Sequence, residues 1–258
     1  ADSISLEGAS TVAARDNLSA DAKSGDLTLI ENSTLAAQTG QMDLDAGNRV
    51  AFTDSSATAA TSMSVDAVDA DIALNNSHAN AGSDLSLNAG SDITLTHSDD
   101  PHTTGSTLTA QLGNLSLAAG DNIALDSASS GVANGDVTAR AITGDLTVIQ
   151  QSLLLAQSGK MDLDAGNRAS ITDSTLSAAT DLAVDALDAD IDLDNATATA
   201  GNNLAMTAGT DVSLDHSTAN AIGGDMDLTG TSGDVTLNQS NASSGGNLTG
   251  TAGQNLAF

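Results

Sequence analysis

The sequence predicts an all-β protein, a right-handed parallel β-helix (a solenoid) built from coils of about 20 residues. Three observations predict it: a long internal duplication, a shorter period inside each copy, and apolar residues that alternate with polar ones. Aromatic residues make up 1% of the chain, which suits a thin interior filled by small aliphatic side chains. The handedness is expected from the right-handed bias of parallel crossovers.

The duplication is the longest-range feature. Residues 25–97 align with residues 144–216 without a gap, at an offset of 144 − 25 = 119, and about three in five positions are identical. The run Met-Asp-Leu-Asp-Ala-Gly-Asn-Arg at residues 42–49 recurs unchanged at residues 161–168. A whole supersecondary assembly has therefore been copied.

A shorter period of about 20 to 22 residues runs inside each copy. Alternating apolar residues such as Met42 and Leu44 open the period, and a second alternating pair such as Val50 and Phe52 follows. Period 2 indicates strands with one buried face, and the Ala-Gly-Asn between the two pairs is typical of a turn. One coil is thus predicted as strand, tight turn, strand, and a looser small-residue segment such as residues 55–61.

Hairpins are the competing interpretation of paired short strands. A parallel β-helix is favoured because repeats of about 20 residues with two or three short strands are typical of its coils. Equivalent residues of successive coils then stack about 4.8 Å apart. This stacking predicts two neighbouring core ladders: Met42–Met63–Leu85 and Leu44–Val65–Leu87.

The predicted organisation is one continuous solenoid. At about 20 residues per coil the chain contains roughly 12 or 13 coils and forms a rod on the order of 60 Å long. The last residues stop in mid-pattern, so we expect the chain to be a piece of a longer rod. The divisions are residues 1–24, the start of the solenoid or a preceding coil, repeat unit 25–143 and repeat unit 144–258.

Composition excludes several classes of function. The 34 Asp and Glu outnumber the 6 Lys and Arg, and the formal net charge of -28 argues against nucleic acid and anionic membranes as partners. The absence of cysteine excludes disulfides and thiolate metal sites. No run of about 18 apolar residues is present, so no membrane span is predicted.

Two segments resemble a known family. Residues 84–95, Asp-Leu-Ser-Leu-Asn-Ala-Gly-Ser-Asp-Ile-Thr-Leu, and residues 114–125, Asn-Leu-Ser-Leu-Ala-Ala-Gly-Asp-Asn-Ile-Ala-Leu, are similar to the repeats of filamentous-haemagglutinin-type exoproteins. These are large passengers of bacterial two-partner secretion, and they include adhesins, biofilm-matrix proteins and contact-dependent toxins. The resemblance extends from about Leu18 to the end of the chain.

The resemblance implies a shaft segment of a large secreted adhesin or biofilm-matrix fibre. It implies an extracellular location at the bacterial cell surface or in the biofilm matrix, after export through an outer-membrane pore partner. It also implies contact with host-cell or matrix polysaccharide, or another surface receptor, through the parent protein. The family's N-terminal secretion motifs and a toxin-like C-terminal domain are not found in this sequence.

Acidic clusters are candidate Ca²⁺ sites. Carboxylates two or three residues apart offer the hard oxygen ligands that Ca²⁺ prefers, and stacked acidic rows attract divalent counterions. The alternative is a solvated outer face of the strands. The candidate ligands recur in the duplication: Asp66, Asp69, Asp71, Asp185, Asp188 and Asp190. No other cofactor is predicted.

A second candidate metal site surrounds Pro101, the one proline of the chain. Its segment is expected to carry one extra residue relative to the segment after His216, and so to protrude as a loop. Several convergent ligands are needed for a metal, and a loop without a metal is the simpler interpretation. The ligands are His97, Asp99, Asp100 and His102.

Two arginines occupy the same turn position in the two copies. We expect Arg49 to pair with Asp69 and Arg168 with Asp188, each one coil further along. Such surface pairs contribute little to stability, and contact with an anionic glycan is the alternative.

The sequence predicts a non-enzymatic structural shaft. Parallel β-helices also serve as polysaccharide lyases and hydrolases that use paired acids, but here the acids belong to the repeat itself. A nucleophile elbow, a Walker loop and a zinc signature are all missing. The alternative is a β-helix whose side binds a glycan or receptor, and a polysaccharide-active enzyme is a remote third.

Overall fold

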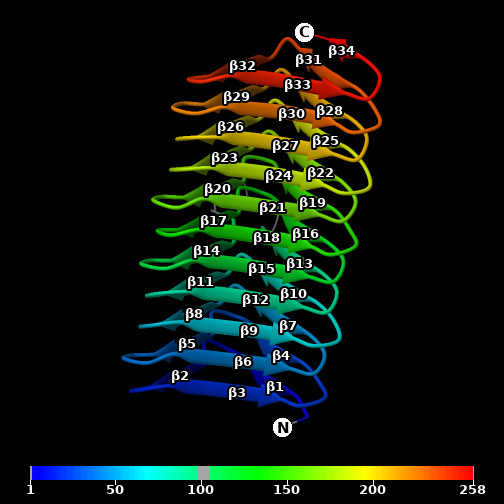
Figure 1. The fold of residues 1–258 in the computed structure, drawn as a ribbon. Coiled ribbons are helices and arrows are strands. Elements are labelled where there is room, and N and C mark those ends of the chain that lie inside the picture. Colours follow the sequence, from blue (N-terminus) through cyan, green and yellow to red (C-terminus); the bar gives the residue numbers. More distant parts are fainter. Residues whose placement is uncertain (1, 98–104, 258) are drawn as a thin grey trace.

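Short runs of alternating apolar and polar residues fold into strands that stack, coil on coil, into a parallel β-helix (Figure 1). The computed structural model describes residues 2–97 and 105–257. Within these ranges the chain forms 34 strands joined by turns, with no helix. The predicted parallel β-helix is confirmed, because every strand pairs in parallel with its equivalent one coil away.

Each coil contributes one strand to each of three sheets, A, B and C, in that order along the chain. Sheet A has 12 strands: β1 (Ile4–Leu6), β4 (Leu27–Leu29), β7 (Val50–Thr53), β10 (Ile72–Asn75), β13 (Ile93–Thr96), β16 (Ile123–Leu125), β19 (Leu146–Ile149), β22 (Ala169–Thr172), β25 (Ile191–Asp194), β28 (Val212–Asp215), β31 (Val235–Asn238) and β34 (Leu256–Ala257).

Sheets B and C have 11 strands each. Sheet B contains β2 (Thr11–Ala14), β5 (Thr34–Ala37), β8 (Ser56–Ala59), β11 (His78–Ala81), β14 (Thr107–Ala110), β17 (Ser130–Ala133), β20 (Leu153–Ala156), β23 (Thr175–Ala178), β26 (Thr197–Ala200), β29 (Thr218–Ala221) and β32 (Asn241–Ser244). Sheet C contains β3 (Leu18–Ala22), β6 (Met42–Ala46), β9 (Met63–Ala67), β12 (Leu85–Ala89), β15 (Leu115–Ala119), β18 (Val137–Ala141), β21 (Met161–Ala165), β24 (Leu182–Ala186), β27 (Leu204–Ala208), β30 (Met226–Gly230) and β33 (Leu248–Ala252).

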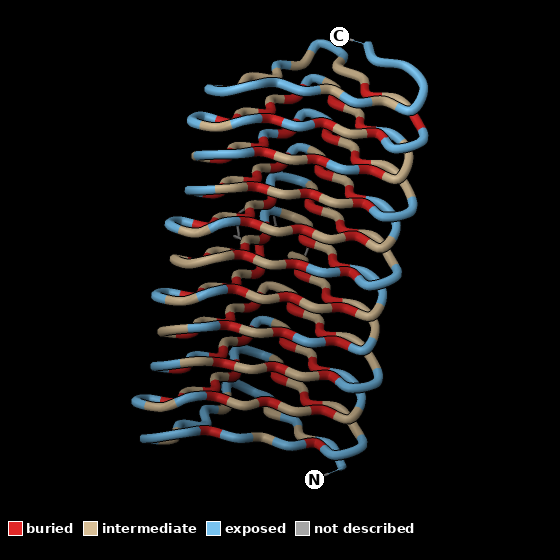
Figure 2. Tube along the Cα trace, in the orientation of Figure 1, coloured by how far each residue is buried: buried red, intermediate tan, exposed pale blue. Residues whose placement is uncertain are grey.

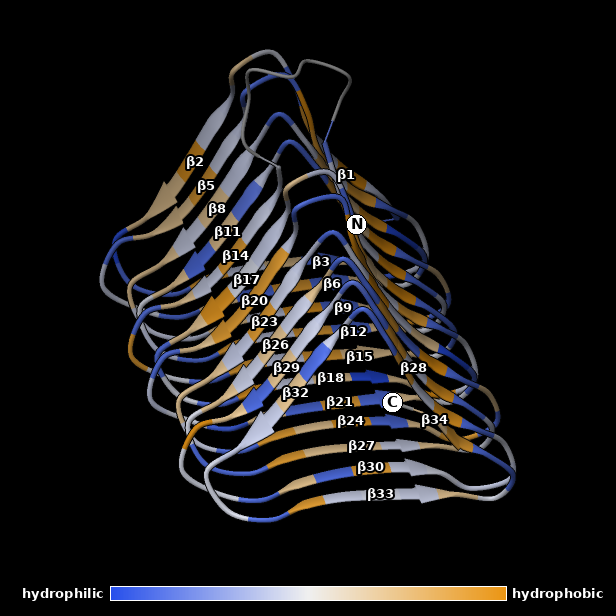
Figure 3. Ribbon diagram, turned by 90° about the horizontal axis from the view of Figure 1, so that it is seen from above, coloured by the Kyte–Doolittle hydropathy of each residue, from blue (hydrophilic) through white to orange (hydrophobic). Residues whose placement is uncertain are grey.

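The three sheets form the sides of a triangular rod (Figure 3). In this view down the rod the C-terminal coils are nearest, and the chain passes counter-clockwise from sheet C to sheet A to sheet B as it approaches the viewer. The coil is therefore right-handed, as the twist of parallel crossovers requires.

In the strands between the terminal coils alternate residues are buried, and together they form a continuous core (Figure 2). Met42 stacks on Met63, and Met63 stacks on Leu85. At most 2% of the surface of each of these residues is exposed. Leu44 stacks on Val65 in the next column. Both predicted core ladders are confirmed, since parallel pairing in register places like on like.

The segment expected to be loose contains a third strand, β8. Ala57 and Ala59 point inward and are buried. Alternating alanine carries a weak hydrophobic signal because the side chain buries little apolar area. Each coil has roughly 22 residues, so the rod has about 11 coils rather than 12 or 13. At about 4.8 Å per coil it is on the order of 50 Å long.

The segment after His97 is longer than expected. Nine residues separate His97 from Thr107, the start of β14, whereas one residue separates His216 from Thr218 in the equivalent coil. The first copy therefore carries eight extra residues rather than one, because the gap-free alignment stops at this point. The remaining candidate ligands lie outside the described residues: Asp99, Asp100 and His102.

The duplicated unit is five coils long. β1 begins at Ile4 and β16, five places along sheet A, begins at Ile123, again an offset of 123 − 4 = 119. Residues 2–24 thus form a coil equivalent to residues 121–143, within the same solenoid.

Columns of Asp and Asn side chains tie each coil to the next at the turns that precede sheets A and C. Before sheet C, Asp84 Oδ1 accepts the Asn114 backbone N–H at 2.8 Å, and Asn114 Oδ1 accepts that of Asp136 at 2.8 Å. Before sheet A, Asp92 Oδ1 accepts the Asn122 N–H at 2.9 Å. These side chains satisfy backbone groups at the edge of each strand ladder.

A column of buried serines does the same before sheet B. The Ser55 backbone N–H donates to Ser77 Oγ at 3.1 Å, and the Ser77 hydroxyl donates to the Asn75 carbonyl at 2.8 Å. A hydroxyl both donates and accepts without carrying charge, so it suits a buried corner. The buried members are Ser33, Ser55, Ser77, Ser106, Ser129, Ser152, Ser174 and Ser217.

Removing one rung of this column tests its contribution. We expect Ser77→Ala to lower the free energy of unfolding by about 1–3 kcal/mol, because the buried Ser55 N–H loses its acceptor. The matched control is Ser86→Ala on the outer face of β12, with an expected change within about 0.5 kcal/mol. Urea unfolding followed by circular dichroism measures both. Equal effects at the two positions would contradict a structural role for the column.

Candidate functional site

The predicted Ca²⁺ ligands are divided between a strand face and a turn. Asp66 lies on the half-buried outer face of β9, whereas Asp69 and Asp71 lie in the turn between β9 and β10. The second copy repeats this division, with Asp185 on β24 and the other two in the following turn, Asp188 and Asp190. The structure therefore does not gather either set of three into one site.

Asp66 instead meets two acids of the preceding coil. Asp43 and Asp45 extend from the same face of β6, and Asp45 is the register partner of Asp66. One carboxylate oxygen from each of the three lies within 4.8 Å of the others. The same arrangement recurs in the second copy: Asp162, Asp164 and Asp185. We call these two groups the carboxylate triads.

Neutral donors already hold one member of the first triad. Ser64 Oγ donates to Asp66 Oδ2 at 2.8 Å, and Asn88 Nδ2 donates to Asp66 Oδ1 at 2.7 Å. Each oxygen of this carboxylate therefore accepts a hydrogen bond from a neutral side chain.

The electrostatic cost of stacking appears at the central carboxylates. Burial raises the pKa of Asp45 above its usual range, and repulsion by Asp43, Asp66 and Asp21 raises it further. Burial likewise raises the pKa of Asp185, with the acids of the preceding coil adding to it and a hydrogen bond from Thr207 opposing it. Among the residues that the structure describes, no cation offsets the desolvation of either group.

The turn acids serve the backbone. Asp71 Oδ1 accepts the Asp92 backbone N–H at 3.3 Å, and Asp190 Oδ1 accepts that of Asp211 at 3.2 Å. Thr210 Oγ1 also donates to Asp190. These two predicted metal ligands therefore belong to the Asp and Asn column that precedes sheet A.

The expected partner of Arg168 is wrong. Arg168 pairs with Asp192 on the outer face of β25, and its Nε donates to Asp192 Oδ2 at 2.8 Å. Asp192 is the register partner of Ser170, two residues after Arg168, and its side chain therefore lies beside the Arg168 guanidinium. Asp188 lies earlier, in the turn before β25. In the first copy Ala73 replaces this acid, and Arg49 has no ion pair within the described residues.

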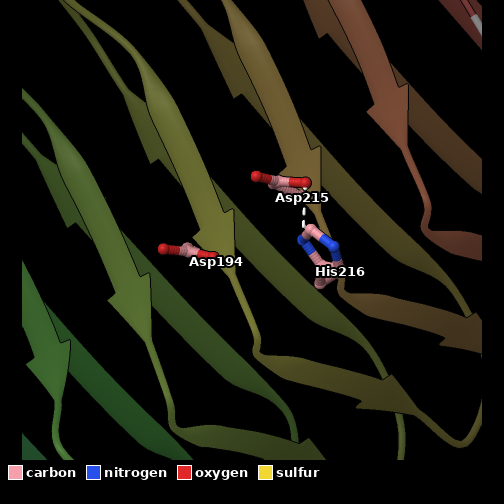
Figure 4. A group of neighbouring side chains, drawn as sticks. All are labelled: Asp194, Asp215 and His216. Atoms are coloured by element: carbon pink, nitrogen blue, oxygen red, sulfur yellow. Dashed lines mark ion pairs between the residues drawn. The ribbon is translucent and has the colours of Figure 1, made fainter.

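A third group of potential ligands lies where sheet A ends (Figure 4). Asp194 stacks on Asp215, and His216 Nδ1 is 2.8 Å from Asp215 Oδ1. His216 has a left-handed backbone, with φ of 48°, which turns its ring back toward the strand end. The first copy has Asn75 and Thr96 in place of the two acids, so this group is not part of the repeat.

The surface hollows are open and shallow. One groove has a volume of about 630 Å³ and follows the edge where sheet C turns toward sheet A, from β18 to the turn after β30. Its lining mixes Ala and Gly with Arg140, Asp164 and Asp185, and it adjoins the second carboxylate triad. Another hollow, of about 320 Å³, crosses the turns between sheets A and B near Asn76 and His78.

No known protein family matches the chain, and neither a curated protein nor a solved structure shows significant similarity to it. Across residues 2–97 and 105–257, no helix has the length and apolar character that crossing a bilayer requires. The side chains of the site are rows of carboxylates, hydroxyls and amides, and these groups bind hard cations and polar groups.

Neutralising the central carboxylate of the first triad tests its environment. A pKa raised in the folded state means that ionised Asp45 costs stability at neutral pH, and that cost disappears as the pH falls through the raised pKa. We therefore expect Asp45→Asn to raise the melting temperature at pH 7 and to have no advantage in acid.

Asp181 provides a control of opposite sign. Its pKa is lowered because the Asn203 backbone N–H donates to it, so its carboxylate stabilises the fold at neutral pH and loses that effect on acidification. Thermal melts of Asp45→Asn and Asp181→Asn from pH 7 downward measure how each substitution changes the melting temperature. Asp181→Asn should lower it at pH 7 and lose that effect in acid. A lower melting temperature for Asp45→Asn at pH 7 would overturn the assignment.

Proposed function

We propose that the chain is a non-enzymatic shaft segment of a large secreted bacterial adhesin or biofilm-matrix fibre, and that it works outside the cell. The observation that carries the proposal is the continuity of the rod. Core ladders and side-chain columns pass from coil to coil along the described chain. Such a body transmits force and holds its ends at a fixed separation.

The chemistry of the surface supports the same function. Asp54, Asp164 and Asp185 line hollows that are open to solvent, and each has an equivalent Asp in the other copy, whereas enzyme sites are usually concave and enclose their substrate. The net charge of -28 keeps the rod soluble and discourages end-on strand pairing. The resemblance of its repeats to filamentous-haemagglutinin-type exoproteins supports export through an outer-membrane pore, with the parent protein contacting the receptor or polysaccharide.

A stretching experiment tests the shaft. Because the chain has no cysteine, Ser3→Cys and Gln254→Cys create two unique attachment points near opposite ends. In an optical trap we expect the rod to resist extension and then yield in steps of one or a few coils. Each coil of roughly 22 residues releases about 70 Å at about 3.3 Å per residue.

The control for this measurement is Ser77→Ala in the same double-cysteine chain, which should lower the force of the first step. Smooth extension at low force, without steps, would contradict the shaft. Binding of the unmodified chain to individual members of a glycan array would instead favour a receptor-binding surface.

Divalent cations form the second part of the proposal. Ca²⁺ would bind at the two carboxylate triads, where one oxygen from each of three carboxylates converges and where burial and repulsion between acids raise the pKa of Asp45 and of Asp185. A bound cation would relieve the repulsion within each acidic column and could crosslink acidic matrix polymers.

Calorimetric titration measures this binding directly. We expect Ca²⁺ to release heat and to raise the melting temperature, and Asp45→Asn combined with Asp164→Asn to remove both effects. Asp181→Asn, outside the triads, should leave them unchanged. A titration without heat, and a melting temperature that chelator does not change, would exclude the cation sites and leave the shaft standing.

A further inference from the structure

The groove at the edge of sheet C has two ridges separated by a notch. Ile142 and Leu187 occupy the same turn position two coils apart. Ile142 is 56% exposed and Leu187 is 75% exposed. Gly166 lies between them, where a Cβ would approach the Ile142 carbonyl oxygen to 2.2 Å. The chain thus presents two aliphatic side chains to solvent, one on each side of a position that has no room for a side chain.

A column of charges runs beside the ridges. Arg140, Asp164 and Asp185 stack in register on the outer face of sheet C, and all three line the groove. Arg140 has no ion pair in the described part of the chain. The positive Arg140 and the negative Asp185 therefore lie two coils apart in this column, about 10 Å from each other, with Asp164 between them.

We propose that two copies of this chain associate antiparallel along this groove, about a two-fold axis that crosses the rod at the coil of Gly166. Such an axis reverses the order of the coils but keeps each column facing itself. Arg140 then faces Asp185 of the partner subunit, and Ile142 faces Leu187 of the partner subunit, each contact occurring twice. At the axis Gly166 meets Gly166 of the partner subunit, and Asp164 meets Asp164 of the partner subunit.

Charge complementarity selects a second copy as the occupant. The overall charge of -28 per chain opposes association, and screening limits that repulsion to about 8 Å at physiological ionic strength. The antiparallel arrangement brings each otherwise unpaired Arg140 against a partner carboxylate, and these two attractions oppose the repulsion between the two copies of Asp164 at the axis. The inference holds whether or not the rod serves as a shaft.

The duplication provides an internal control. In the first copy the equivalent positions hold Asp21 for Arg140, Lys23 for Ile142 and Val68 for Leu187. The same symmetric contact there would face Asp21 with Asp66 of the partner subunit, and like charges would repel. The proposed interface therefore belongs to the second copy alone.

Sedimentation velocity of the full chain tests the proposal, with chelator present so that cations cannot bridge the acids. At about 0.15 M salt we expect a concentration-dependent dimer. R140D and D185R should each weaken it by roughly tenfold or more. Mixing R140D with D185R places opposite charges at both contacts and should restore a heterodimer.

Controls separate the interface from folding and from net charge. Arg15→Asp makes the same charge change on a distant coil and should leave the dimer intact, as should Val68→Ala, whereas Leu187→Ala should weaken it. Circular dichroism verifies that each variant is folded. A wild-type chain that stays monomeric at every concentration, or folded R140D and D185R that fail to associate on mixing, would overturn the proposal.

Discussion

Backbone pairing between successive coils is the constraint on which the rest of this structure depends. Each strand pairs in parallel and in register with its equivalent, so every side chain stacks on the side chain one coil away, about 4.8 Å distant. For apolar residues this is favourable, because Met42, Met63 and Leu85 fill one column without gaps. The same register decides which polar residue is tolerated at each corner.

The register turns charge into a structural problem. An Asp on an outer face lies beside the Asp of the next coil, and the pKa of Asp45 is raised by burial and further by repulsion from the neighbouring acids. Neutral donors such as Ser64 and Asn88 hydrogen-bond to Asp66, and the chain places other acids where they accept backbone N–H groups. Asp71 and Asp45 therefore have opposite electrostatic roles although both belong to acidic repeats.

The fold could be predicted from sequence because its main signal is repetition. Alternation at Met42 and Leu44, repeated every coil, specifies strand, face and stacking partner together. The third strand could not be recognised in the same way, since Ala57 and Ala59 are small enough to resemble a loop. The site was harder still. The sequence groups Asp66 with Asp69 and Asp71, its neighbours along the chain, but its spatial neighbours Asp43 and Asp45 come from the preceding coil, a relation that depends on the exact register.

The two copies of the five-coil unit separate what the geometry requires from what it leaves open. Gly47 and Gly166 are identical because a side chain at either would collide with the carbonyl of the preceding coil, at 2.3 and 2.2 Å. Asp45 and Asp164 are also identical, although the register makes acidic stacking costly there. Asp21 and Arg140 differ in sign at equivalent positions on an open face, where the coil imposes neither choice. Since the fold accepts both, the reason for an arginine beside two aliphatic ridges must be sought in what contacts that face.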